Sequence, residues 1–170
     1  MQLYSRHLID KGVSLPHYAV IRINLAWYRK GMRIPKGYDL FFDYPFKRRK
    51  PPQPEFTLSE AIKFASELNA KYFAISNAED DMASLRKLLP NKIKLVPKIE
   101  TMKGVDNLKE IIEEAQTDLI MLDTEDLYLN AGNRYKEYLD KFNEEVQHST
   151  FYIEKKLKVL RMGGVVFCDY

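Results

Sequence analysis

Apolar residues along this chain gather in short continuous runs, which longer charged segments separate. The runs have the length of strands and are rich in β-branched and aromatic residues, without the period of a helix. Continuous apolar runs are typical of strands that are covered on both faces, as in parallel α/β sheets. The predicted strands are residues 19–25, 39–42, 72–75, 93–99, 119–122 and 165–168.

The segments between these strands carry helix signals. Thr57 and Glu60 form a capping-box pattern ahead of apolar residues at helical spacing. Pro90 stops a second helical pattern, and Gly104 precedes a third. The predicted helices cover residues 61–68, 80–89, 105–114 and 134–160, the last as two helices or one bent helix. Strands that alternate with helices through short links indicate right-handed βαβ crossovers.

The length of the chain limits how far such a sheet can extend. With 170 residues, 45% of them apolar, the chain is long enough for one sizeable core, and we interpret residues 1–170 as a single domain. A closed (β/α)8 barrel takes about 250 residues. The expected fold is therefore α/β, a partial TIM-barrel-like parallel sheet of about six βα units. Its two open edges predict a homo-oligomer, because unpaired strand edges are normally covered or paired.

The composition of the chain constrains its cellular location and its class of partner, but says little about the reaction. No run approaches the roughly 18 apolar residues of a membrane span, and the first residues lack the apolar region of a signal peptide, so we expect a cytoplasmic protein that does not bind membranes. Cys168 is the single cysteine, which excludes an internal disulfide and a multi-cysteine zinc site. A net charge of +3 does not predict nucleic-acid binding. The basic run 47–50 is either a solvated loop or a contact for a phosphorylated ligand.

Charged residues end two of the predicted strands, where parallel α/β folds bind their ligands. One strand finishes with Lys98 and Glu100, and the next finishes with Asp123, Glu125 and Asp126. Because these strands are consecutive, their carboxyl ends should be neighbours. Carboxylates from neighbouring strands favour Mg²⁺ or Mn²⁺, which prefer oxygen ligands. The alternative is a set of loop carboxylates that surface lysines neutralise.

Six longer segments stand out between residues 20 and 127: VIRINLA, LFFDYP, TLSEAIKFASELNAKYFAIS, NAEDDMASLRKLL, KLVPKIETMKGVDNLKEII and DLIMLDTEDL. Their order resembles that of the catalytic barrel of pyruvate kinases, and the chain looks like strands 2 to 7 of that barrel. The most specific match is a lysine two residues before a glutamate, followed by G-[VI]-[DE]-N. Here it comprises Lys98, Glu100 and residues 104–107.

A second resemblance concerns EDLYLNAG, residues 125–132. It is similar to the E-D-L-x-x-x-x-G of citrate lyase β-subunits and 2-oxo-acid aldolases, which share the phosphoenolpyruvate/pyruvate-type barrel. The separation of 26 residues between Glu100 and Asp126 suits this branch as well. Arg22 lies where those lyases keep a carboxylate-binding arginine. Lys98 favours the kinase branch and EDLYLNAG favours the lyase branch, so both stay open.

The resemblance implies a site for pyruvate, phosphoenolpyruvate or a related small 2-oxo acid. Glu100 and Asp126 would bind the Mg²⁺ or Mn²⁺ ion that bridges the carboxylate and 2-oxo oxygens of the ligand and stabilises an enolate. Lys98 would stabilise the developing negative charge. Arg22 would neutralise a carboxylate or phosphate of the substrate.

Asn24 and Asp43 match positions that pyruvate kinases use for a monovalent cation, K⁺. Between Asp43 and Thr57 there is no room for the lid domain that holds nucleotide in pyruvate kinases, so ADP is expected to bind weakly or not at all.

Two classes of function stay open. One is a metal-dependent enzyme, a phosphotransferase or a carbon-carbon lyase, and the other is a non-catalytic relative that serves in binding or assembly.

Overall fold

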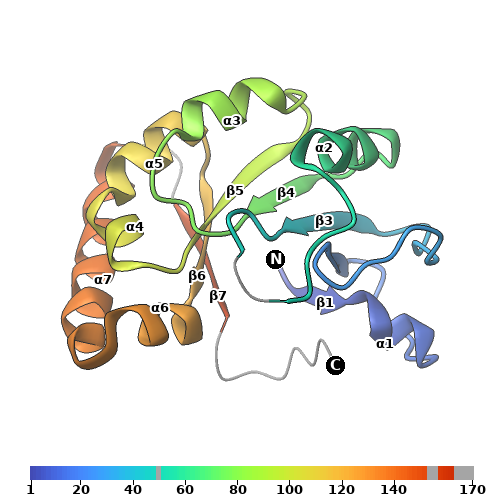
Figure 1. Ribbon diagram of the computed structural model, residues 1–170, viewed down its shortest axis with the longest axis horizontal. Helices are drawn as coiled ribbons and strands as arrows, with labels where there is room; N and C mark the ends of the chain where they lie inside the picture. Colours follow the sequence, from blue (N-terminus) through green and yellow to red (C-terminus); the bar gives the residue numbers. More distant parts are fainter. Residues whose placement is uncertain (49–50, 153–156, 163–170) are drawn as a thin grey trace.

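The computed structural model describes residues 1–48, 51–152 and 157–162. Within these residues, seven parallel strands form one sheet in chain order. The sheet curls into a half-barrel (Figure 1). The strands are β1 (Leu3–Ser5), β2 (Val20–Asn24), β3 (Asp39–Tyr44), β4 (Tyr72–Ile75), β5 (Lys94–Ile99), β6 (Leu119–Asp123) and β7 (Lys158–Met162). The expected α/β fold with a partial barrel is therefore confirmed.

Helices connect most of the strands, and α2, α3, α5 and α7 lie along the outer side of the curled sheet (Figure 1). The helices are α1 (Arg6–Asp10), α2 (Leu58–Glu67), α3 (Met82–Leu88), α4 (Met102–Asp106), α5 (Leu108–Ala115), α6 (Thr124–Ala131) and α7 (Tyr135–Tyr152), with the 3-10 helix η1 (Gly132–Arg134) between the last two. Because these helices cover the convex side, the concave side is left for the site.

Local signals in the sequence set several of these boundaries. Thr57 caps α2 as expected, since its side chain accepts a hydrogen bond from Glu60 N at 3.3 Å and its own N donates to Glu60 Oε2 at 2.8 Å. Helix α3 ends before Pro90, which cannot continue a helix. Gly104 lies so close to Ala78 that an added Cβ would be 2.6 Å from the Ala78 carbonyl oxygen. The glycine of the lysine-glutamate motif is therefore required by close packing.

Both faces of the sheet are buried, which explains the continuous apolar runs. On the outer face, residues such as Ile21, Ile23 and Phe42 belong to the main core under the helices. Successive side chains of a strand point to opposite faces, so the same strands also supply an inner cluster. The buried members of this inner cluster are Leu3, Val20, Phe41, Ala74, Val96, Leu119 and Met121.

Two strands differ from the expectation. The sequence does not predict β1, because three residues are too few to show a period. The expectation of helix up to residue 160 is wrong, because the chain pairs with β6 from Lys158 onward, starting with a hydrogen bond from Lys158 N to Asp118 O at 2.8 Å. This pairing sets Leu160 beside Met121. Contact with β6 overrides the helical pattern here. The expected strand 165–168, with Cys168, lies outside the described residues.

The sheet has two edges within the part of the chain that the structure describes, because β1 pairs there only with β2 and β7 only with β6. A homo-oligomer stays a prediction, and light scattering at high micromolar concentration should show a species larger than the monomer. A strict monomer would contradict it.

Among the described helices, none is both long enough and apolar enough to cross a membrane.

Candidate functional site

Polar side chains occupy the carboxyl-terminal part of the inner face. They continue the period of the inner apolar cluster, since Arg22 follows Val20 by two residues on β2 and Asp43 follows Phe41 by two residues on β3. Together they surround a cavity of about 600 Å³. Its polar lining includes Arg22, Asn24, Asp43, Ser76, Lys98, Glu100, Asp123 and Asp126. The cavity thus lies at the strand ends where the sequence places the site.

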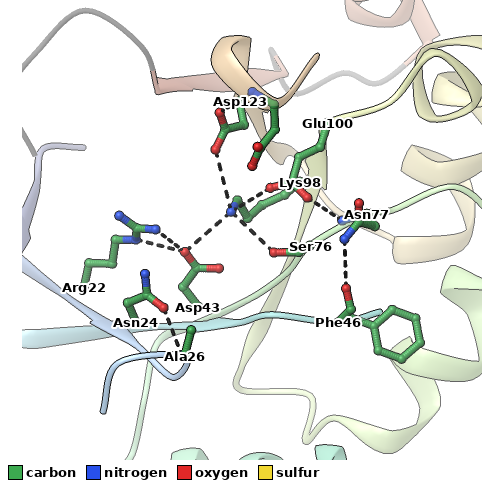
Figure 2. Close-up of polar contacts among 11 residues, drawn as sticks. Arg22, Asn24, Ala26, Asp43, Phe46, Ser76, Asn77, Lys98, Glu100 and Asp123 are labelled. Carbon is green, nitrogen blue, oxygen red and sulfur yellow. Dashed lines mark hydrogen bonds and ion pairs between the residues drawn. The ribbon is translucent and has the colours of Figure 1, made fainter. Parts of the chain in front are cut away.

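Lys98 lies at the centre of this group, between three carboxylates (Figure 2). Its Nζ is 2.8 Å from Glu100 Oε1, 3.6 Å from Asp43 Oδ2 and 3.9 Å from Asp123 Oδ2. It also donates a hydrogen bond to Ser76 Oγ at 3.4 Å. Burial by itself would lower the pKa of Lys98, but the charges of Asp43 and Glu100 outweigh burial and raise the pKa above its ordinary value. Lys98 is therefore a permanent cation in this cavity.

Arg22 and Asp43 form a buried ion pair between β2 and β3. The Nε and Nη2 atoms of Arg22 donate to Asp43 Oδ2 at 2.9 Å and 2.5 Å (Figure 2). Burial would raise the pKa of Asp43, but Lys98 and Arg22 outweigh it and lower the pKa below its ordinary range. The structure thus pairs the expected anion-binding arginine with one of the two residues expected to bind K⁺. The other, Asn24, lines the same cavity, and its Oδ1 accepts a hydrogen bond from Ala26 N at 3.1 Å.

Glu100, Asp123 and Asp126 bring carboxylate oxygens within 4.8 Å of one another. Glu100 follows β5, and its Oε2 accepts a hydrogen bond from Asn77 N at 2.7 Å. Asp123 ends β6, and its Oδ1 accepts a hydrogen bond from Asp126 N at 3.2 Å in the first turn of α6. The two residues expected to bind a metal, Glu100 and Asp126, therefore meet in space. Glu125 is exposed and lies outside this group.

Two residues of the site have no role in the sequence-based interpretation. Asp123 is noted there as the end of a strand, but the metal is assigned to Glu100 and Asp126 alone. Ser76, which contacts Lys98, is not considered. Both continue the inner-face period, because Asp123 lies two residues after Met121 and Ser76 two residues after Ala74. That period was the signal that could have found them.

Two of these carboxyl groups are unfavourable to the fold when they are ionised. Burial raises the pKa of Glu100 and of Asp123, although Lys98 lies beside both. A carboxyl group whose folded-state pKa is raised contributes stability below its unfolded pKa, and loses that contribution as the pH rises through the folded value. Without a bound cation, the ionised site therefore lowers stability at neutral pH.

Substituting Asp123→Asn should raise the free energy of unfolding by about 1 kcal/mol in metal-free buffer at neutral pH, a size common for stabilising changes at functional sites. The substitution removes a charge that is largely shielded from solvent, and asparagine is as good a helix cap as aspartate. Urea denaturation of both proteins measures the gain. The difference should shrink at about pH 3.5, where the wild-type carboxyl is protonated. Equal or lower stability of the variant at neutral pH would contradict the electrostatic interpretation.

No protein-family model matches the chain, and no curated protein matches it either. The resemblance to pyruvate kinases therefore rests on the motifs and their order. Because one fold can host many unrelated functions, the half-barrel by itself does not identify the reaction. The function has to be inferred from the chemistry of the site.

Proposed function

We propose that this protein binds a divalent cation together with pyruvate, phosphoenolpyruvate or a related small 2-oxo acid, and promotes formation of the enolate. The observation that carries the proposal is the group of three carboxylates, Glu100, Asp123 and Asp126, beside the buried ammonium group of Lys98. The order of the pyruvate kinase-like motifs supports the same function. So does the place of the cavity, at the carboxyl ends of parallel strands.

The residues suit Mg²⁺ or Mn²⁺ in ligand type and in charge. Both ions take oxygen ligands, and Mg²⁺ typically keeps several positions for water and substrate. Around the three-carboxylate group, two cations, Arg22 and Lys98, face four carboxylates. The carboxylates are those of Asp43, Glu100, Asp123 and Asp126, which leaves a formal excess of two negative charges among these groups; the other charged lining residues, Lys47, Arg48 and Glu79, come from loops. A divalent ion held by Glu100, Asp123 and Asp126 would neutralise that excess.

Two cations of the cavity, Lys98 and Arg22, would contact the ligand directly. Asp43 would hold Arg22 in place. When bound, the ion would supply a Lewis acid that stabilises negative charge on the ligand oxygens. Lys98 keeps its proton, so its N–H groups can donate to an oxygen on which charge develops. Asp43 holds the guanidinium group of Arg22 at the same cavity. These groups are buried, which strengthens their electrostatic interactions with a ligand.

A non-catalytic relative is the second candidate, and the buried network itself favours it. Arg22 and Lys98 already have carboxylate partners inside the protein. A satisfied buried network can be retained because it makes the core rigid and specific, without turnover.

A carbon-carbon lyase would use the same enolate chemistry as the kinase branch. ADP is not part of either proposal, because residues 45–57 connect β3 directly to α2.

Proton exchange at the methyl group of pyruvate in D₂O tests the proposal, because enolate formation transfers one of these protons to water, and the enolate then takes up a deuteron from the solvent. We expect NMR to show exchange that requires both the protein and Mg²⁺. Glu100→Gln should abolish it, since that change removes one carboxylate of the group. Glu125→Gln is the matched control, because Glu125 is exposed and lies outside the group.

Binding of oxalate in the presence of Mn²⁺, measured by calorimetry, separates the two candidates. Oxalate resembles the enolate in shape and charge but cannot react further. Binding of oxalate without exchange of pyruvate protons would favour the non-catalytic candidate. If the protein neither binds oxalate nor catalyses the exchange, the proposal is wrong.

A further inference from the structure

A basic region lies at the outer end of the cavity. Lys47 and Arg48, in the connection between β3 and α2, line the same cavity as the three carboxylates. Lys47 is exposed and Arg48 is half-buried, whereas Glu100 is buried. Glu79, a half-buried loop residue of the same lining, is already paired with Lys103 and accepts a hydrogen bond from Thr101. The cavity therefore has an acidic inner wall and, at Lys47 and Arg48, a basic region that is called the basic mouth below.

Hydrogen bonds hold the backbone next to Lys47 in a fixed relation to the acidic wall. Asn77 donates from Nδ2 to Phe46 O at 2.9 Å and from its backbone N to Glu100 Oε2 at 2.7 Å (Figure 2). Phe46 N also donates to Tyr44 O at 2.9 Å, at the end of β3. A single residue, Asn77, thus ties the loop to a carboxylate of the candidate metal group. The basic mouth is positioned by the same contacts that orient Glu100.

The ion pair of Lys47 leaves its ammonium group able to turn to a ligand. Lys47 Nζ is 3.4 Å from Asp80 Oδ1, and about half of each side chain is exposed. Exposed ion pairs of this kind contribute little to stability. Asp80 also contacts Lys103 at 2.5 Å, so it keeps a cationic partner when Lys47 moves.

We infer that the ligand carries a second anionic group, a carboxylate or a phosphoryl group, which binds Lys47 and Arg48 while its 2-oxo acid end lies at the acidic wall. This inference rests on the proposed function and names its substrate class. A cavity of about 600 Å³ is of the size that holds drug-sized ligands, so a three-carbon acid would fill only part of it. Charge-assisted hydrogen bonds at the mouth favour an anionic tail over an apolar one.

Two ligands with the same five-carbon chain test the inference. They are 2-oxoglutarate, which ends in a carboxylate, and 2-oxopentanoate, which ends in a methyl group. In calorimetry with Mn²⁺ present, we expect the wild type to bind 2-oxoglutarate at least about tenfold more tightly, the scale of a hydrogen bond to a charged group. The preference should weaken as salt is added. Comparison with 2-oxo-4-phosphonobutanoate shows whether a phosphoryl-like tail binds better than a carboxylate.

Variants of the basic mouth connect the preference to these residues. Lys47→Gly removes the ammonium group and tolerates the backbone φ of 55° at this position, which glycine adopts without strain. Lys47→Gly and Arg48→Ala should each reduce the preference for 2-oxoglutarate and leave the affinity for 2-oxopentanoate unchanged. Lys63→Ala is the control, because Lys63 is an exposed cation on α2 that pairs with Glu67 and does not line the cavity, and it should keep the preference.

The outcomes separate this inference from the proposed function. Binding of 2-oxopentanoate without a preference for 2-oxoglutarate would overturn the inference and leave the proposed function standing. A preference that persists in both Lys47→Gly and Arg48→Ala would also overturn it. Failure of both five-carbon ligands to bind in the presence of Mn²⁺, while oxalate still binds, would overturn the inference alone. Failure of oxalate to bind as well would count against the proposed function.

Discussion

Mn²⁺ at a hundredfold excess over its Kd is expected to stabilise the wild-type protein by about 2.7 kcal/mol, because an ion that binds only the folded state shifts the folding equilibrium by RT ln(1 + [L]/Kd). Glu100→Ala and Asp126→Ala each remove one of the oxygens that lie within 4.8 Å of one another. Each variant should therefore lose most of this gain. Thermal denaturation with and without Mn²⁺, followed by circular dichroism, measures the shift.

Glu125→Ala is the matched control for the metal experiment. Glu125 lies in the same first turn of α6 as Asp126, but its side chain is exposed and outside the carboxylate group. It should keep the full response to Mn²⁺. Small shifts of the same size in the wild type and all three variants would indicate diffuse binding to surface acids, and would contradict a metal centre.

Asp43→Asn is expected to lower the free energy of unfolding by about 3–5 kcal/mol, the usual cost of removing one partner of a buried ion pair. The change keeps the shape of the side chain, so the loss comes from charge. It leaves the buried Arg22 without the carboxylate that now lies 2.5 Å from it, and removes one of the three carboxylates around Lys98. Urea denaturation at neutral pH measures the effect.

Asp39→Asn is the control at the other end of the same strand. Asp39 pairs with Lys71 at 2.8 Å, but both side chains are about half exposed, so its loss should cost less than about 1 kcal/mol. The effect of Asp43 should also depend on pH. Because the pKa of Asp43 is lowered in the folded state, its contribution is present above about pH 4 and is lost as the pH falls through the folded value. Equal losses in the two variants at neutral pH would contradict a special role for Asp43.

The strands with the most continuous apolar runs are also those whose positions agree with the sequence. The predicted strand 72–75 matches β4, and the runs predicted at 39–42, 93–99 and 119–122 overlap β3, β5 and β6. These strands are buried on both faces, so nearly every position of the run has to be apolar and the run itself marks the strand. β1 and β7 are the strands at the two ends of the sheet, and their short or charged sequences carry no such mark.

The site also contains residues that local sequence patterns identify and contacts that depend on how the strands pair. Lys98 and Glu100 could be placed at the site from the sequence because a charged residue at the end of an apolar run marks a strand end, and strand ends of a parallel sheet meet at one edge. Asp126 is singled out among the acidic residues after the next strand through the resemblance to pyruvate kinases and citrate lyases. The pairing of Arg22 with Asp43 could not be named. It depends on the register of β2 against β3, in which Arg22 lies opposite Phe41 and Asn24 opposite Asp43.

By itself, the sequence therefore determined the fold class, the order of most elements and the edge of the sheet that carries the charged residues. These depend on period, capping and strand ends, all of which are local patterns along the chain. The inner-face period indicates that Asp123 faces the site, but only the tertiary structure decided that its carboxylate lies within 4.8 Å of those of Glu100 and Asp126, and that Lys98 lies among three carboxylates. It also decided that Lys47 faces the same cavity. The reason is physical: these distances depend on how a curled sheet brings together side chains from separate strands and loops, and no local pattern records the curl.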